Sequence, residues 1–175
     1  MIMGKIIGKN IIGGSAADNG SVVKTKNSNK SWRTAIHRKK PSAPFMYLYQ
    51  QGLIKGQVLD YGCGLGRDLT FMLSAGIQAK GFDPYYLPNK LDKEIFDTIV
   101  CIYVLNVLPV ADRMEVMSNI RQALKYGGHA YIAVRRDLKI DEILTTVGTK
   151  QYQVYLNIPV IFDNKKYCIY DYTKI

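Results

Sequence analysis

Apolar residues along the chain fall into short runs that alternate with segments of helical spacing. The runs are rich in β-branched residues, which is typical of strands covered on both faces. They predict strands at Gln57–Tyr61, Ile77–Phe82, Phe96–Leu105 and His129–Val134. Helical spacing or a terminal glycine predicts helices at Phe45–Gln51, Asp68–Ala75, Ala111–Lys125 and Asp141–Val147. This alternation predicts an α/β, three-layer sandwich with a mainly parallel sheet.

The two ends of the chain depart from this alternation. Gln151–Ile158 and Tyr167–Tyr172 alternate polar and apolar residues, which predicts a closing antiparallel pair of strands. Residues 1–30 are rich in Gly, Asn, Ser and Lys, so we expect a flexible basic extension there. Residues 31–175 are expected to form one domain.

Composition narrows the class of protein and its compartment. The chain has 175 residues, of which 47% are hydrophobic and 22% charged, as is ordinary for one soluble globular domain. The longest apolar runs are far shorter than the ~20 residues of a membrane-spanning helix. The three cysteines form no CxxC pair, so we expect no metal site, no disulfide framework and a cytoplasmic location.

The net charge of +10 is concentrated in the N-terminal third. Residues 1–55 hold ten basic side chains and one acidic side chain, for a net charge of +9, whereas residues 56–175 carry only +1. Such asymmetry indicates an arm that meets an anionic partner, most often DNA or RNA. A solubilising tail without a specific partner explains the same charge, because attraction to phosphate needs only charge.

The most informative segment is the glycine-rich sequence VLDYGCGLG, which ends at Gly66. An apolar strand runs into Asp60, and the glycines then allow a sharp turn and the close approach of a ligand before a helix begins. A dinucleotide-binding fold would need a third glycine where this chain has Arg67, and an acid such as Asp60 is foreign to that fingerprint. The spacing therefore disfavours a NAD-dependent enzyme.

The glycine segment resembles motif I of the class I S-adenosylmethionine-dependent methyltransferases. Further segments match that family in order, namely GFDPYY, FDTIVCIYVLNVLP and LKYGGHAYIAV. The resemblance covers about residues 55–136 and implies a Rossmann-like fold with S-adenosyl-L-methionine as cofactor. Thirteen residues separate Asp83 from Asp97, which is too few for a helix and a full third strand, so we expect a sheet reduced at that strand.

A narrower resemblance links the chain to a small methyltransferase group associated with DNA phosphorothioation and with other bacterial or phage defence loci. The matching residues are Thr34, Ala35, Ile36, Arg38, Ser42, Pro44, Asp68, Asp83, Pro84, Tyr85, Tyr86, Pro88 and the segment Tyr103–Val107. The association by itself identifies no acceptor.

The methyltransferase resemblance implies a set of cofactor-binding residues. An acid at the position of Asp83 binds the ribose hydroxyls in that family, and a carboxylate suits this task because it accepts two hydrogen bonds at once. Asp60 is expected to orient the methionine end of the cofactor or to cap the glycine turn, and Asp68 to contact the cofactor or to cap the helix. The predicted cofactor-binding residues are Asp60, Tyr61, Gly62, Cys63, Gly64, Gly66, Asp68, Asp83, Pro84, Tyr85 and Asn106.

The segment Asp83-Pro84-Tyr85-Tyr86 also resembles the DPPY motif of amino-methyltransferases. That motif follows the fourth strand, whereas the segment here follows the second. Tyr85 or Tyr86 is therefore expected to cover the adenosine rather than to hold an acceptor amine.

Candidate catalytic residues are Asn106 and His37. Asn106 lies at the fourth-strand position of the family, where it orients an acceptor atom or fixes a turn. His37 is a candidate general base. The predicted substrate contacts are Arg38, Tyr86, Arg135 and Arg136, with exposed charge as the alternative for the last two.

The favoured function is transfer of the methyl group of S-adenosylmethionine to a nucleic acid. The alternatives are a small-molecule or protein methyltransferase, and a catalytically inactive subunit that keeps the fold for binding or structure. The oligomeric state and the acceptor atom are left open.

Overall fold

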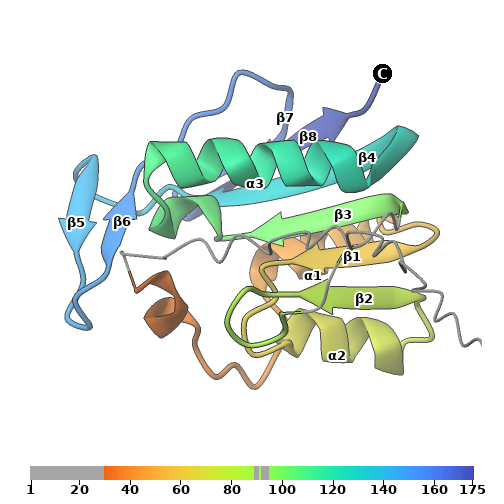
Figure 1. Ribbon diagram of the computed structural model, residues 1–175, viewed down its shortest axis with the longest axis horizontal. Helices are drawn as coiled ribbons and strands as arrows, with labels where there is room; N and C mark the ends of the chain where they lie inside the picture. The colour runs from red at the N-terminus through yellow and green to blue at the C-terminus, as the bar shows by residue number, and fades with distance from the viewer. Residues whose placement is uncertain (1–29, 89–90, 92–94) are drawn as a thin grey trace, which may run out of the picture.

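The predicted sheet is present, with helices on both of its faces (Figure 1). A computed structural model describes residues 30–88, 91 and 95–175, so the predicted extension lies outside these residues except for its last one. The main sheet has six strands in the order β2-β1-β3-β4-β8-β7, and β5 and β6 form a separate hairpin. The strands are β1 Val58–Tyr61, β2 Ala79–Phe82, β3 Phe96–Ile102, β4 Leu124–Arg135, β5 Glu142–Leu144, β6 Lys150–Tyr152, β7 Val160–Asp163 and β8 Tyr167–Thr173.

The first four strands are parallel, so their carboxyl ends meet at one edge of the sheet. β1 pairs with β2 and with β3, Val58 lying between Ala79 and Thr98. β3 pairs in parallel with β4, with Ile99 opposite Ala130. In open α/β sheets, ligands bind outside this carboxyl edge. The loops that follow β1, β2 and β3 are therefore the place to look for a site.

The last two strands of the sheet correct the predicted strand pairing. β8 is antiparallel to β4, with Ala133 opposite Ile169. Its other neighbour is β7, so the prediction that Gln151–Ile158 forms its partner is wrong. Residues of that predicted strand pair with β5 instead, because a tight turn brings β5 and β6 together.

The β5–β6 hairpin replaces the predicted helix Asp141–Val147, which is therefore wrong. The turn is closed by Thr145, whose N–H donates to the carbonyl oxygen of Thr149 at 2.9 Å. Gly148 occupies the turn with a φ of +74°, which glycine adopts without strain. The β-branched residues of this stretch favour extended backbone. The turn at Thr145–Thr149 then brings β5 and β6 together as a pair.

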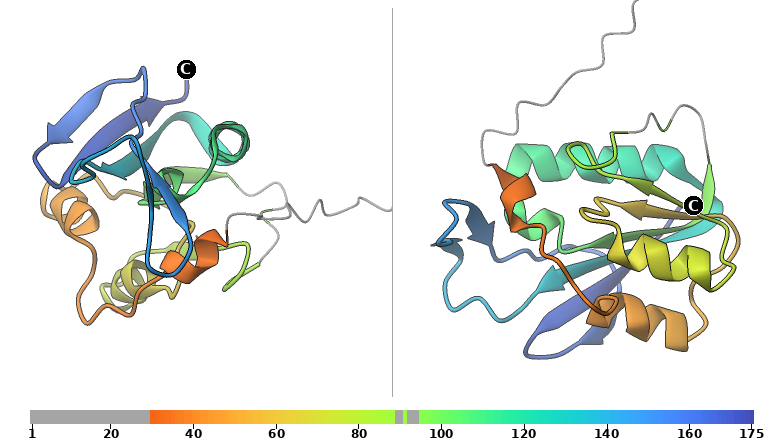
Figure 2. Two further views of the ribbon diagram at one scale, coloured as in Figure 1. Left: turned by 90° about the vertical axis from the view of Figure 1, so that its left-hand side faces the viewer. Right: turned by 90° about the horizontal axis from the view of Figure 1, so that it is seen from below.

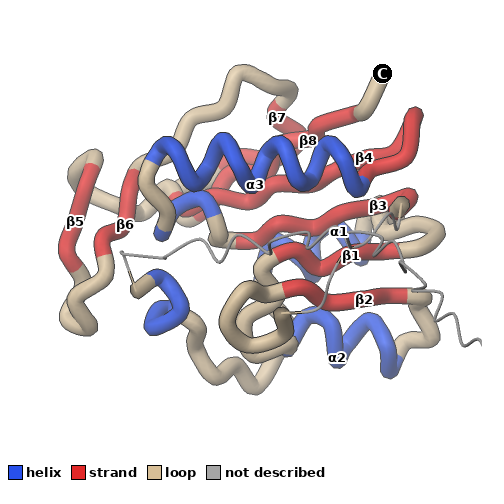
Figure 3. The backbone as a smooth tube through the Cα atoms, in the orientation of Figure 1, coloured by secondary structure: helices blue, strands red, loops and turns tan. Residues whose placement is uncertain are grey.

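Helices cover the two faces of the sheet unequally (Figures 2 and 3). α1 and α2 lie on one face and α3 lies on the other. Their bounds are α1 Ala43–Gln50, α2 Arg67–Ser74 and α3 Val110–Ala123, with two 3-10 helices, η1 Ser31–Thr34 and η2 Leu105–Val107. These three α-helices confirm the predicted ones to within two residues at each end. Within the part of the chain that the structure describes, no helix could cross a membrane.

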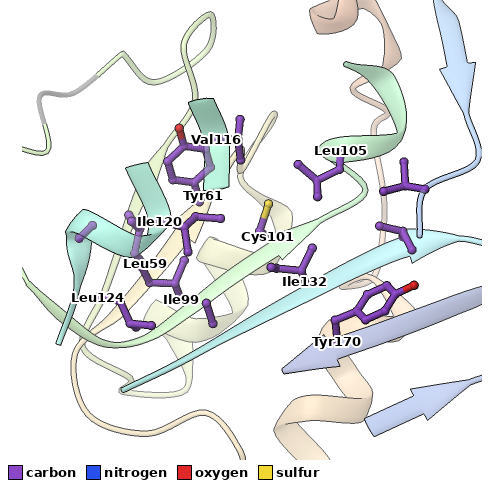
Figure 4. Close-up of a cluster of buried hydrophobic side chains, with 14 of the residues drawn as sticks. Leu59, Tyr61, Ile99, Cys101, Leu105, Val116, Ile120, Leu124, Ile132 and Tyr170 are labelled. Atoms are coloured by element: carbon purple, nitrogen blue, oxygen red, sulfur yellow. The ribbon is translucent and has the colours of Figure 1, made fainter. Parts of the chain in front are cut away.

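Alternate residues of the central strands contribute to two separate cores. Leu59 and Ile99 point toward α3, where Ile120 is fully buried among them (Figure 4). Their neighbours Val58 and Val100 point to the opposite face and pack in the cluster beneath α1 and α2. This alternation is the period of two that a strand imposes on its side chains. The sheet is thereby buried on both faces, as a parallel sheet requires.

The predicted glycine stop after α3 lies inside β4 instead. α3 ends at Ala123 and β4 begins with the next residue, so this connection uses no glycine. Gly127 and Gly128 sit where the register between β3 and β4 shifts. A Cβ on Gly128 would lie 2.9 Å from the carbonyl oxygen of Asp97, so the glycine permits a close approach of two strands.

The connection between β2 and β3 is short, as predicted. Asp83 and Leu87 form a bridge in which each N–H donates to the other's carbonyl oxygen at 3.0 Å. The residues described between Phe82 and Phe96 form no further strand of the sheet, and β2 stands at its edge. The reduced α/β architecture is confirmed.

Burial within α3 predicts the effect of truncating its side chains. Ile120 is fully buried, whereas Met114, which also belongs to the apolar pattern of this segment, is 70% exposed. We expect Ile120→Ala to lower the free energy of unfolding by about 2–5 kcal/mol, because it leaves a cavity in the core. Met114→Ala is the matched control and should change it by less than about 0.5 kcal/mol. Urea denaturation measures both, and equal losses would contradict this packing.

Candidate functional site

Three loops meet at the carboxyl edge of the parallel strands. The glycine loop follows β1, a turn that starts at Asp83 follows β2, and Tyr103 follows β3. η1 and the β5–β6 hairpin lie side by side in front of this edge, as the left view of Figure 2 shows. Thr149 Oγ1 joins them by donating to the carbonyl oxygen of Lys30 at 3.3 Å. Segments from both ends of the described chain therefore bound the edge.

The glycine loop is held against the end of β2 by its own backbone. The N–H groups of Gly62 and Cys63 both donate to the carbonyl oxygen of Phe82, at 2.7 and 3.0 Å. Gly62 has a φ of +76°, and a Cβ there would lie 2.3 Å from Val104 Cγ2. Gly66 has a φ of +73° at the start of α2, with nothing within 4 Å of a Cβ position. The loop therefore packs tightly against Val104 at Gly62, whereas the space beside Gly66, at the N-terminus of α2, is free of other atoms of the described residues.

Asp83 joins the glycine loop to the turn after β2. One carboxylate oxygen accepts from the N–H of Gly64 at 3.0 Å, and the other accepts from the N–H groups of Tyr85 and Tyr86, both at 2.9 Å. Two carboxylate oxygens offer about four acceptor positions, so capacity for a ligand hydroxyl remains. Asp83 is therefore both a structural tie and a candidate ligand for the ribose.

Asp60 is a buried carboxyl group with an unused oxygen. The residue is 4% exposed, and its Oδ2 has no hydrogen-bond partner among the described residues. Burial raises the pKa of Asp60 well above its ordinary value of 3.8, and the charges of Asp68 and Asp83 raise it further. The N–H of Leu69 and the charge of Arg38 lower this pKa and oppose the shift. This buried acceptor beside the glycine loop makes Asp60 a candidate to accept a hydrogen bond from a ligand.

Asp68, predicted either to contact the cofactor or to cap the helix, has a structural role in the fold. Its two oxygens accept from the N–H and the hydroxyl of Ser42, at 2.7 and 2.6 Å, and the residue is 6% exposed. Ser42 in turn caps α1 by accepting from the N–H of Phe45 at 3.3 Å. Asp68 therefore fixes the start of α1 against the start of α2, and it influences the site through its charge.

The residues around the glycine loop fit the cofactor that the sequence implies. S-adenosylmethionine carries a cationic sulfonium and a cationic ammonium group. Asp60, Asp68 and Asp83 make this end of the site negative, and a bound cation stabilises their charged forms. Asp60 would accept a hydrogen bond from the ammonium group, and Asp83 from the ribose hydroxyls. Among the residues that the structure describes, no group of three or more His, Cys, Asp or Glu side chains could hold a metal ion.

Asn106, predicted as a catalytic and cofactor-binding residue or as a residue that fixes a turn, is bound by backbone groups at both ends of its amide. It is fully buried in η2. Its Nδ2 donates to the carbonyl oxygen of Tyr152 at 2.8 Å, and its Oδ1 accepts from the N–H of Arg135 at 2.7 Å. Through these two bonds Asn106 ties the end of β4 to β6, which favours the structural alternative.

Arg135 is held by protein groups where a substrate contact is predicted. Its Nε and Nη2 donate to the two carboxylate oxygens of Asp137, both at 2.8 Å, and its Nη1 donates to Gln151 Oε1 at 2.5 Å. The Asp137 carboxylate raises the pKa of Arg135, as expected for a bidentate pair. Arg135 thereby ties the end of β4 to β6, and its predicted contact with a substrate phosphate stays a prediction.

Arg136 is likewise engaged within the fold. Its Nη1 donates to the carbonyl oxygen of Val154 at 2.8 Å, and its Nη2 donates to the hydroxyl of Tyr170 at 2.6 Å. The guanidinium also lies 4.6 Å from the ring centre of Tyr155. Only 12% of the Arg136 side chain is exposed, so little of it is available to a substrate without rearrangement.

Tyr61 and Cys63 are two further predicted cofactor residues of the glycine segment. The side chain of Tyr61 lies in the core, and the thiol of Cys63 stays protonated at neutral pH. The ring of Tyr61 is buried in the core beneath α3, and its hydroxyl accepts from Asn119 Nδ2 at 3.2 Å. Cys63 is half-buried, and burial followed by the charges of Asp60 and Asp83 raises the pKa of its thiol to about 12. Tyr61 therefore contributes only its backbone to the loop.

Arg38 and Tyr103 meet at the end of β3, and sequence reasoning assigned no role to Tyr103. The guanidinium of Arg38 lies 5.8 Å from the ring centre of Tyr103 and makes no hydrogen bond or ion pair within the described part of the chain. Tyr103 has a φ of +61°, a strained conformation for this residue type. Burial raises the pKa of Tyr103 to about 12. Neighbouring His37 is exposed.

An aromatic cluster covers the turn after β2, and its most important member, Trp32, is missing from the sequence-based prediction. The rings of Trp32 and Tyr85 stack 4.4 Å apart at an angle of 5°. The hydroxyl of Tyr86 donates to the carbonyl oxygen of Trp32 at 3.0 Å. Pro84, which precedes these tyrosines, is exposed. No local signal predicts this contact, because it joins residues more than fifty positions apart.

Comparison with models of protein families identifies the family of this chain. Residues 31–171 match a family model described as a methyltransferase domain. The chain belongs to this family and is a S-adenosylmethionine-dependent methyltransferase. No curated protein sequence matches it.

Solved structures of similar fold include several methyltransferases. The glycopeptide N-methyltransferase MtfA complexed with S-adenosyl-L-methionine has a TM-score of 0.58 at 13% identity, with 77% of this chain and 93% of that chain covered. The Burkholderia thailandensis 1,6-didemethyltoxoflavin-N1-methyltransferase, bound to 1,6-didemethyltoxoflavin and S-adenosylhomocysteine, has a TM-score of 0.57 at 13% identity, with 82% and 77% covered. A structure from work on disulfide-to-thioacetal conversion in echinomycin biosynthesis has a TM-score of 0.50 at 23% identity, and the chain covers only 52% of it. These likenesses establish the fold.

The close approach at Gly62 predicts that two glycine substitutions differ in cost. Gly62 and Gly76 both have positive φ, but a Cβ has open space only at Gly76. Gly76→Ala should lower the free energy of unfolding by about 1–2 kcal/mol through backbone strain alone. Gly62→Ala adds the displacement of Val104 and should cost a further ~1–3 kcal/mol. Urea denaturation of the two variants checks this, and equal losses would show that Val104 is not in the way.

The contacts of Asn106 predict a loss of stability and not of cofactor binding. Asn106→Ala leaves the N–H of Arg135 and the carbonyl of Tyr152 without their partner. We expect the free energy of unfolding to fall by about 1–3 kcal/mol, the cost of leaving buried polar groups unpaired. Calorimetric affinity for S-adenosylmethionine, measured well below the melting temperature, should stay within about twofold of wild type, since ~0.4 kcal/mol is the corresponding change in free energy. Wild-type stability with lost affinity would restore Asn106 to the cofactor site.

Proposed function

We propose that the enzyme transfers the methyl group of S-adenosylmethionine to a nucleic acid. The observation that carries this proposal is the charge of the segment that crosses the site. Residues 30–40 contain five basic side chains and no acidic one, whereas residues 1–29 carry a net charge of only +3. More than half of the N-terminal charge therefore belongs to this segment rather than to the extension.

The segment 30–40 is attached to the cofactor site by two contacts. Arg38 lies over the ring of Tyr103 at the end of β3. Arg67, at the start of α2, donates to the carbonyl oxygen of Lys39. The side chains of Arg33, Lys39 and Lys40 are exposed. This path along the carboxyl edge supports an anionic acceptor, whose phosphates a row of cations would attract.

Methyl transfer is an in-line displacement, so the protein contributes mainly by positioning. The bound cofactor supplies an electrophilic methyl group on its sulfonium. Asp83 would bind the ribose and Asp60 the ammonium group. The methyl group would then lie toward Tyr103, which belongs to the third loop of the site, after β3. An acceptor that is already nucleophilic needs no general base, and exposed His37 is assigned none.

A small-molecule acceptor is the second candidate. It is favoured by the fold neighbours, since one of them carries 1,6-didemethyltoxoflavin and is an N-methyltransferase of it. At 13% identity this likeness bears on the fold and leaves the acceptor of this chain to experiment. The basic segment 30–40 is the observation that favours the nucleic acid over a small molecule.

The test is to incubate the full chain with cofactor that carries a radiolabelled methyl group and with separate DNA, RNA, protein and small-molecule fractions of a cell extract. We expect label in the DNA or RNA fraction. Label in the small-molecule or protein fraction alone would overturn the nucleic-acid acceptor and leave the methyltransferase activity intact.

The position of the cations predicts a change in salt dependence. Changing Arg33, Lys39 and Lys40 together to Ala should make the log–log salt slope of oligonucleotide binding shallower by about 2–3, since each phosphate contact contributes roughly 0.7–0.9. The matched control changes the exposed residues Lys139, Lys165 and Lys166 to Ala and should keep the wild-type slope. Fluorescence anisotropy at several salt concentrations gives the slopes. Identical slopes for the two triple variants would contradict a role for the 30–40 segment.

A further inference from the structure

A shallow pocket of about 640 Å³ opens between η1, the turn after β2 and the tip of the β5–β6 hairpin. It is lined by Trp32, Arg33, Tyr86, Thr146, Val147 and Gly148. The residues of the glycine loop are not part of its wall, and the pocket adjoins the predicted cofactor site through Tyr86. Tyr86 follows Asp83 by three residues, which places the pocket beside the predicted ribose ligand.

The walls of the pocket are held in place by contacts between distant parts of the chain. Tyr86 donates its hydroxyl proton to the carbonyl oxygen of Trp32, and Tyr85 stacks on the ring of Trp32. On the other side, the buried hydroxyl of Thr149 donates to the carbonyl oxygen of Lys30. η1 is thus fixed against both the turn and the hairpin, and the pocket needs little rearrangement to receive a ligand.

The chemistry of the walls combines flat aromatic surface with positive charge. Trp32 and Tyr86 line the pocket. One face of the Trp32 ring is stacked on Tyr85 and the guanidinium of Arg33 lies over the ring, 5.2 Å from its centre, so a planar ligand would stack beside this guanidinium. Val147 is 46% exposed at the hairpin tip and adds apolar surface. Aromatic rings and guanidinium planes stack on nucleobases, and such stacking tolerates any base.

We propose that this pocket receives an unstacked base of the nucleic-acid acceptor, while the basic segment 30–40 binds the phosphates on either side. The inference rests on the proposed nucleic-acid function and adds the site at which one base is held. Arg33 supplies charge in the wall of the pocket itself, and Arg38 and Lys39 continue the basic segment toward the cofactor site. A base taken out of its stack is the form in which an enzyme reaches a base atom.

Trp32 allows a direct test, because it is the only tryptophan of the chain. The full protein is titrated with a short single-stranded oligonucleotide and with an abasic oligonucleotide of the same length and charge, at ~50 mM salt, where phosphate contacts are strong. We expect the base-containing strand to quench the Trp32 fluorescence at saturation and the abasic strand to bind without quenching it.

Variants separate stacking from the folding of η1. Trp32→Ala should weaken binding of the base-containing strand by about tenfold, on the scale of one lost stack, and leave binding of the abasic strand unchanged. Trp32→Phe keeps an aromatic face and should restore most of the affinity. Tyr126→Ala removes an aromatic ring that is 81% exposed on β4 and serves as the matched control, with no expected effect. Anisotropy of a labelled strand measures all four proteins.

The outcomes distinguish the pocket from the proposed function. If both strands bind the wild-type protein alike, with equal effects on Trp32 and equal losses in Trp32→Ala, the pocket holds no base although the nucleic-acid function stands. If neither strand binds while S-adenosylmethionine still does, the nucleic-acid function is overturned and the pocket assignment with it.

Discussion

Three carboxyl groups converge on the glycine loop, and the arrangement of the site depends on how each is compensated. Asp68 is compensated by both donors of Ser42, which joins α1 to α2. Asp83 is compensated by three backbone N–H groups, which fix the loop against the turn after β2. Asp60 is left with a buried oxygen that has no partner among the described residues. Asp68 and Asp83 thus hold the loops of the site together, and the free oxygen of Asp60 is available to a ligand.

The uncompensated carboxyl group couples ligand binding to pH. The pKa of Asp60 is raised in the folded protein, so this group favours folding below its ordinary pKa of 3.8, and that contribution is lost as the pH rises through the folded value. A cationic ligand reverses the balance, because it stabilises the ionised form. Because binding then releases a proton, S-adenosylmethionine should bind and stabilise the protein more strongly as the pH rises, until Asp60 is already ionised in the free protein.

The sequence predicted the parts of this account that depend on local pattern. The parallel strands, three α-helices and the two acids Asp60 and Asp83 follow from periodicity and from motif order. The hairpin at β5–β6 was beyond such reasoning, because a short β-branched stretch suits either state until Gly148 sets the turn. The partners of Asn106 could not be predicted, because polar residues at a carboxyl edge also bind backbone groups and Tyr152 lies 46 positions away.

The most direct test of the central claim is the number of protons exchanged when S-adenosylmethionine binds. Isothermal titration calorimetry in two buffers of different ionisation enthalpy measures this number as the pH is raised from the ordinary value of 3.8 through neutrality. The account predicts that the wild-type protein releases protons on binding within this range and that Asp60→Asn, which binds more weakly, releases fewer. Equal proton release by the two proteins would contradict the assignment of Asp60 as the group that the cationic cofactor compensates.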